Sequence, residues 1–109
     1  MQMQLVADVT ATLTATEYPT IGYNTPFLPG NTVVGMLVKD GDFAGDNITI
    51  RTDNSQSAGS PAWETIRAAA DGDLATTPVI ELFEFVLGDN IEITAATITA
   101  GGFKFYLLS

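Results

Sequence analysis

Apolar and polar side chains alternate with a period of two along most of the chain. Between residues 5 and 15 the odd positions are leucine, alanine or valine, and most even positions are aspartate or threonine. This alternation is typical of a β-strand with one buried face. We therefore expect one long strand over residues 5–15, with Thr10, Thr12 and Thr14 on its outer face.

Six further segments are predicted as strands, each separated from the next by glycine, asparagine, aspartate or proline. Their ranges are 33–39, 48–52, 62–70, 79–87, 91–99 and 103–108. Segment 62–70 also contains helix-forming residues from Glu64 to Ala70, and its assignment as a strand follows from the strands around it. Segment 40–47 has the composition of a turn.

This spacing predicts an all-β protein, a single antiparallel β-sandwich or jelly roll. We expect about seven to eight strands and at most one short helix. A chain of 109 residues has the usual length of one domain, so residues 1–109 are expected to form a single β-sandwich domain.

The segment 18–31 departs from the alternating pattern. It contains three prolines and two glycines, and prolines at this density exclude a central strand. We interpret it as an irregular, Pro-rich loop. Its apolar side chains are expected to cover one end of the core or a neighbouring subunit. These are Ile21, Tyr23, Phe27 and Leu28.

The last predicted strand, 103–108, is apolar on both faces. One face carries two phenylalanines and a leucine, and the other carries Tyr106 and Leu108. A sandwich strand between core and water needs one apolar face only. Tyr106 and Leu108 are therefore candidate interface residues. Thr10, Thr12 and Thr14 are a second candidate contact, because hydroxyls both donate and accept hydrogen bonds.

The composition and net charge of the chain argue against several classes of function. The chain has 4 lysines and arginines and 13 aspartates and glutamates, a formal net charge of −9. This balance argues against binding a nucleic acid backbone or an anionic membrane. The absence of histidine and cysteine removes the commonest general base and all thiolate chemistry. We therefore expect no enzymatic activity and no cofactor. We also expect no membrane partner, since no apolar run approaches the length of a membrane span.

The acidic segment 40–46 is the best candidate for a metal site. Its carboxylates lie at the first, third and seventh positions, a spacing used by calcium loops. However, Ala44 and Arg51 stand at the fifth and twelfth positions, where ligands are required. The segment is therefore predicted to be a solvent-exposed turn and not a metal site.

Trp63 is the single tryptophan. A tryptophan in a small sandwich most often fills the core, so we expect Trp63 to pack with Ile48, Ile50 and Phe105. The alternative is a sugar-stacking platform shared with tyrosines. These are Tyr18, Tyr23 and Tyr106.

Two longer segments resemble a known group of proteins. Segment 45–66 consists of Gly-Asp-Asn-Ile-Thr-Ile-Arg-Thr-Asp-Asn-Ser, a polar loop, and Ala-Trp-Glu-Thr-Ile. Segment 85–108 ends with a Gly-Gly turn and an alternating strand, Phe-Lys-Phe-Tyr-Leu-Leu. This order resembles the small β-sandwich and jelly-roll proteins of tailed-bacteriophage virions, among them head decoration or cement proteins.

The resemblance implies a structural virion protein, made in the host cytoplasm, that binds the major capsid protein and stabilises the phage head. It also implies self-association, as a homotrimer, and it brings no functional residues with it. The alternative function is a carbohydrate-binding or adhesion module. A sugar binder should expose at least two aromatic side chains on one face, whereas a decoration protein should expose an aliphatic patch.

Overall fold

Eight β-strands form along the residues that the structure describes, and no helix occurs among them. The structure is a computed structural model that describes residues 3–19, 30–53, 62–68 and 79–108. The strands are β1 (Met3–Val9), β2 (Leu13–Pro19), β3 (Thr32–Lys39), β4 (Ala44–Asp53), β5 (Trp63–Arg67), β6 (Ile80–Val86), β7 (Asn90–Ala100) and β8 (Phe103–Leu108).

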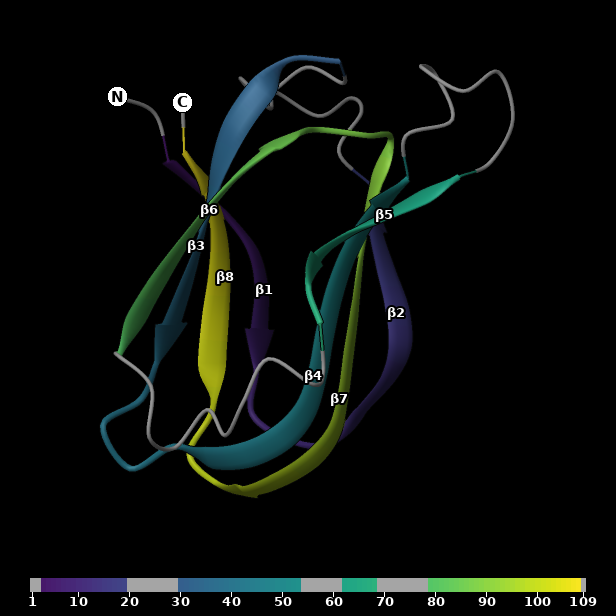
Figure 1. Cartoon of the computed structure of the whole chain (residues 1–109). Coiled ribbons are helices and arrows are strands. Elements are labelled where there is room, and N and C mark those ends of the chain that lie inside the picture. Colours follow the sequence, from purple (N-terminus) through teal and green to yellow (C-terminus); the bar gives the residue numbers. More distant parts are fainter. Residues whose placement is uncertain (1–2, 20–29, 54–61, 69–78, 109) are drawn as a thin grey trace.

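The strands form two four-stranded antiparallel sheets that pack face to face (Figure 1). One sheet has the order β1-β8-β3-β6, and the other has the order β2-β7-β4-β5. The pairs β1·β8, β2·β7, β3·β6 and β4·β5 are nested, so the chain is one long antiparallel ribbon folded over on itself. This is the strand order of a jelly roll, and the predicted all-β antiparallel sandwich is confirmed.

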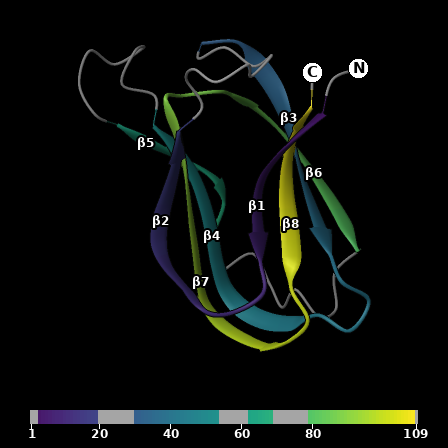
Figure 2. The same cartoon turned by 180° about the vertical axis from the view of Figure 1, so that it is seen from behind.

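The core lies between the inner faces of the two sheets. Leu37 and Phe105 of the first sheet and Ile48 and Ile93 of the second have no exposed surface. The first and last strands lie side by side, because Met3 pairs with Leu108 across β1 and β8 (Figure 2). Every other residue of β8 points into this core, so the alternation predicted for 103–108 is confirmed.

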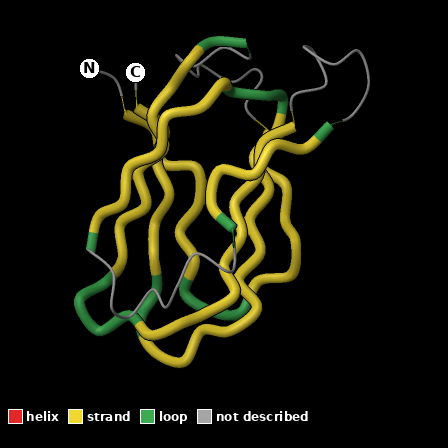
Figure 3. Tube along the Cα trace, in the orientation of Figure 1, coloured by secondary structure: helices red, strands yellow, loops and turns green. Residues whose placement is uncertain are grey.

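The single strand predicted over residues 5–15 is wrong. β1 ends at Val9 and β2 begins at Leu13, and residues 10–12 carry the chain from one sheet to the other (Figure 3). The alternation continues through this crossing, so periodicity alone does not reveal it.

A register shift between Leu5 and Ala7 also turns Leu5 outward and Ala7 inward, as expected of a β-bulge.

The turn predicted over residues 40–47 is shorter than expected. β4 begins at Ala44 and continues to Asp53, so the strand predicted at 48–52 is longer at both ends. Asn47 has a φ of 55° within this strand, a left-handed conformation that asparagine tolerates better than most residues. The strand predicted at 62–70 is confirmed as the shorter β5.

The turn between β6 and β7 is fixed to the end of β4. The Gly88 N–H donates to the Thr52 hydroxyl oxygen at 2.8 Å, and that hydroxyl donates to the Asn90 carbonyl at 3.0 Å. The Asp89 N–H donates to the Asp53 carbonyl at 2.9 Å. Because Thr52 is fully buried, these bonds satisfy groups that water does not reach.

Replacing Gly88 with alanine is expected to lower the free energy of unfolding by at least about 2 kcal/mol. A Cβ atom at this position would lie 1.4 Å from the Asp53 carbonyl oxygen, so the turn would have to move. Gly41→Ala is the matched control, because a Cβ atom there meets nothing within 4 Å. Urea unfolding should show a change of less than about 0.5 kcal/mol for the control. Equal effects of the two variants would contradict this account of the turn.

Candidate interaction surface

The outer face of the β1-β8-β3-β6 sheet is apolar. Leu5, Tyr106, Met36 and Leu82 are cross-strand partners and form one row across all four strands. Directly paired residues project to the same side of a sheet, so this row is continuous. We call the surface the apolar face. It consists of Met3, Leu5, Val34, Met36, Val38, Ile80, Leu82, Val86, Tyr106 and Leu108.

The apolar face is open to solvent in the isolated chain. Leu82 is 64% exposed, Met3 is 59% exposed and Ile80 is 51% exposed. The apolar-face residues of the two central strands, β8 and β3, are half-buried by their neighbours. Soluble monomers rarely expose a contiguous apolar patch of more than a few hundred Å², and such patches mark interaction sites.

Charged residues lie at the rim of the apolar face. Asp8 and Lys104 are cross-strand partners at one end of β1 and β8, and Lys104 also lies opposite Val38 of β3. Glu84 is exposed on the edge strand β6, opposite Val34. The centre of the face, around Tyr106 and Met36, is therefore apolar, with charges on its border, an arrangement typical of protein interfaces.

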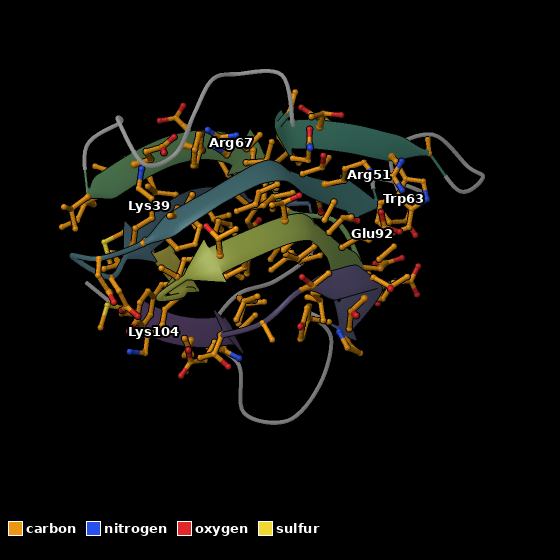
Figure 4. The ribbon with its side chains drawn as sticks, turned by 90° about the horizontal axis from the view of Figure 1, so that it is seen from below. Lys39, Arg51, Trp63, Arg67, Glu92 and Lys104 are labelled. Carbon is orange, nitrogen blue, oxygen red and sulfur yellow. The ribbon has the colours of Figure 1, made fainter. Side chains whose placement is uncertain are left out.

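The outer face of the β2-β7-β4-β5 sheet is polar. Glu17, Glu92, Arg51 and Thr65 form the equivalent row across its four strands. Arg51 donates from Nε to Glu92 Oε1 at 2.9 Å, and its Nη2 pairs with the same oxygen (Figure 4). The two outer faces thus differ in chemistry, and one of them has the composition expected of a surface in water.

Trp63 is not in the core, so the position predicted for it is wrong. It is partly buried at the start of β5, an edge strand, and pairs with Asp53 at the end of β4. The Arg51 guanidinium lies over its ring, 4.9 Å from the ring centre, at the distance of a cation–π contact. Ile48, Ile50 and Phe105, its predicted neighbours, belong to the core cluster, and Trp63 does not.

The structure brings together only part of the predicted interface. Tyr106 and Leu108 lie side by side on the apolar face with residues of β1 and β3. Thr10 and Thr12 lie in the crossing between the sheets, and Thr14 lies in β2, so the three threonines do not form one strand face. Ile21, Tyr23, Phe27 and Leu28 lie outside the described residues.

Sequence reasoning missed most of the apolar face. The signal was present, because segments 33–39 and 79–87 are apolar in both registers of the alternation. Such segments also occur where a strand is buried on both faces. The register of β3, β6 and β8 is needed to place Met36 and Leu82 beside Tyr106.

Three charged residues connect the sheets from inside. Lys39 of β3 and Arg67 of β5 are 4% and 2% exposed. Both pair with Glu81 of β6: Lys39 Nζ lies 2.6 Å from Oε2, and Arg67 Nε lies 3.4 Å from Oε1. Arg67 also donates to the Ala68 carbonyl at 3.0 Å. Because β3 and β6 belong to one sheet and β5 to the other, Glu81 holds the two sheets together.

In the acidic segment 40–46, Asp40 forms hydrogen bonds with the backbone of a neighbouring turn. The Asp40 carboxylate accepts a hydrogen bond from the Gly102 N–H at 3.0 Å, and the Gly102 carbonyl accepts one from the Asp40 N–H at 2.9 Å. These bonds join the β3–β4 turn to the β7–β8 turn. Among the described residues, no three acidic side chains gather as metal ligands would.

Comparison of the chain with models of known protein families, with curated proteins and with solved structures found no match. Within the described part of the chain there is also no helix long and apolar enough to cross a membrane.

Replacing Glu81 with glutamine is expected to lower the free energy of unfolding by about 3 kcal/mol. The change removes the negative charge between two buried cations, Lys39 and Arg67. Glu64→Gln, at an exposed position of β5, is the matched control and should change stability by less than about 0.5 kcal/mol. Thermal or urea unfolding of the two variants gives the comparison, and a Glu81→Gln protein as stable as the control would refute the role of Glu81.

Proposed function

We propose that this protein is a structural virion protein that binds the shell of a phage head and stabilises it, as a decoration or cement protein. The observation that carries the proposal is the apolar face. A protein that works alone in water has no use for a sheet face of leucine, methionine, valine and tyrosine, whereas a subunit of an assembly buries such a face against a partner.

The inner packing of the sandwich supports this interpretation. Leu37 and Phe105 already bury the inner face of the first sheet, so the outer residues Met36 and Tyr106 are not needed to complete the core. They are neighbours of Leu37 and Phe105 in the same strands. A second apolar face on a strand whose first face is satisfied points to a contact outside the fold.

The phage setting rests on the sequence resemblance and on analogy with other jelly rolls, a fold used by capsid proteins and lectins alike. On the same basis we propose the major capsid protein as the partner, the virion as the location, and a closed homo-oligomer, a trimer by the resemblance. The described charged clusters also favour binding over catalysis, since Lys39, Arg67 and Arg51 are engaged in structural ion pairs.

The carbohydrate-binding alternative has less support. Its best residue is Trp63, on the outer side of the polar sheet, but Arg51 covers the ring. Tyr106 lies on the opposite sheet, and Tyr18 packs against the core. Within the described residues, Trp63 thus has no second aromatic side chain on its face with which to form a sugar platform.

The proposal is tested by adding purified protein to heads of the source phage that lack it. The wild-type chain should be retained on these heads after sedimentation. Leu82→Lys places a charge at the centre row of the apolar face and should weaken retention at least about tenfold. Thr65→Lys, at an exposed position in the centre row of the polar sheet, adds the same charge and should bind as the wild type does.

Two results would contradict the proposal. One is a wild-type chain that does not bind the heads. The other is an equal loss of binding for Leu82→Lys and Thr65→Lys, which would indicate that charge, and not the apolar face, controls the contact.

A further inference from the structure

We infer that the occupant of the apolar face is a second copy of this chain, packed with like face against like face about a symmetry axis. The inference deepens the proposed function and rests on it in one respect, that the apolar face is a protein contact. It names the partner at that contact as the chain itself, before any capsid is present.

The dimensions of the face suit this occupant. Four strands about 4.8 Å apart and six residues per strand give a surface about 19 Å wide and about 20 Å long, a footprint of about 400 Å². The accessible area of a corrugated face exceeds its footprint. Two copies therefore bury a total area close to the lower limit for a specific interface, which is about 1,000 Å².

The shape of the face suits it as well. It is one outer side of a sandwich, and two such sides stack about 10 Å apart with interdigitating side chains, as the inner faces of a sandwich do. The row Leu5, Tyr106, Met36 and Leu82 runs across the middle of the face. A twofold axis that lies in the plane of contact and runs along this row places the row of one copy on the same row of the other copy. The contact is then self-complementary, as an isologous interface requires.

Charge favours this face over the others for contact between identical chains. Each copy carries −9, so two copies repel each other wherever their acidic residues meet. The apolar face has two acidic residues at its rim, Asp8 and Glu84, and Lys104 lies opposite Asp8 on the neighbouring strand. The outer face of the opposite sheet presents Glu17, Glu92 and Asp53, and Arg51 is paired with Glu92.

These properties predict weak, salt-strengthened association. An interface near the lower size limit gives a dissociation constant on the order of micromolar. Raising the NaCl concentration from about 0.05 M to about 0.5 M shortens the screening length and reduces the repulsion between acidic copies. Association through the apolar face should therefore become several-fold tighter, whereas association through ion pairs would weaken.

Sedimentation velocity of the purified wild-type chain, from about 1 to about 100 µM, measures the association directly. We expect a concentration-dependent dimer of the 11.5 kDa chain, because an isologous contact closes at two copies. Leu82→Lys and Leu82→Glu should each weaken association at least about tenfold. Because Leu82 is 64% exposed in the isolated chain, both variants should keep the wild-type circular dichroism spectrum. Thr65→Lys is again the control and should associate as the wild type does.

A mixing experiment tests the like-face geometry. An equal mixture of Leu82→Lys and Leu82→Glu protein places opposite charges on the two stacked faces, so the mixture should associate more tightly than either variant alone. A mixture no tighter than the separate variants would overturn the inference.

The outcomes separate this inference from the proposed function. A wild-type chain that stays monomeric at about 100 µM and yet binds phage heads overturns the inference and leaves the proposed function standing, with the capsid as the occupant of the face. A chain that associates through Leu82 but does not bind heads supports the inference and contradicts the proposed function.

Discussion

A strand in a two-sheet sandwich has two faces, and only one of them meets the other sheet. In this protein the inner faces form a closed core, in which Leu37, Phe105, Ile48 and Ile93 have no exposed surface. The nested strand pairs, the crossing at residues 10–12 and the tied turn at Gly88 all serve to bring these inner faces together. Side chains on the outer faces are not part of this core. The two outer faces differ in composition, one polar and one apolar.

The polar sheet follows the rule for a surface in water, with a row of acidic residues, an arginine and a threonine. The apolar face breaks that rule across all four strands of its sheet. Apolar surface left in water weakens solubility and contributes nothing to folding. A net charge of −9 offsets this by keeping isolated copies apart, and the same charge makes association sensitive to salt. The proposed functions of the face follow from this contrast between the two sheets of the sandwich.

The sequence predicted the fold well, because period-two alternation and turn residues are local signals. Strand β8 has the predicted bounds, and β3, β6 and β7 differ from the prediction by a residue at one or both ends. The crossing at residues 10–12 and the outward turn of Leu5 were not predictable in this way, since both depend on which strand pairs with which. Trp63 was misplaced for a related reason: its size favours burial, but it stands at the start of an edge strand and lies beneath Arg51.

The candidate surface was predictable in outline only. The two apolar faces of segment 103–108 pointed to Tyr106 and Leu108 as contact residues, and the register of β8 with β1 and β3 extends that pair into a whole sheet face. The cluster of Lys39, Glu81 and Arg67 had no sequence signal, because its members are distant in the chain and meet only when the sheets pack.

The central claim, that the apolar face is buried when the protein is assembled, is tested most directly by oxidative footprinting. Met3 and Met36 lie on this face, and Met3 is 59% exposed in the isolated chain. Oxidation of a methionine to its sulfoxide depends on exposure. We predict that Met3 is oxidised readily in dilute protein and is protected in the assembled state, while Trp63 on the other sheet reacts equally in both. Equal oxidation of Met3 in the dilute and assembled states would contradict the account.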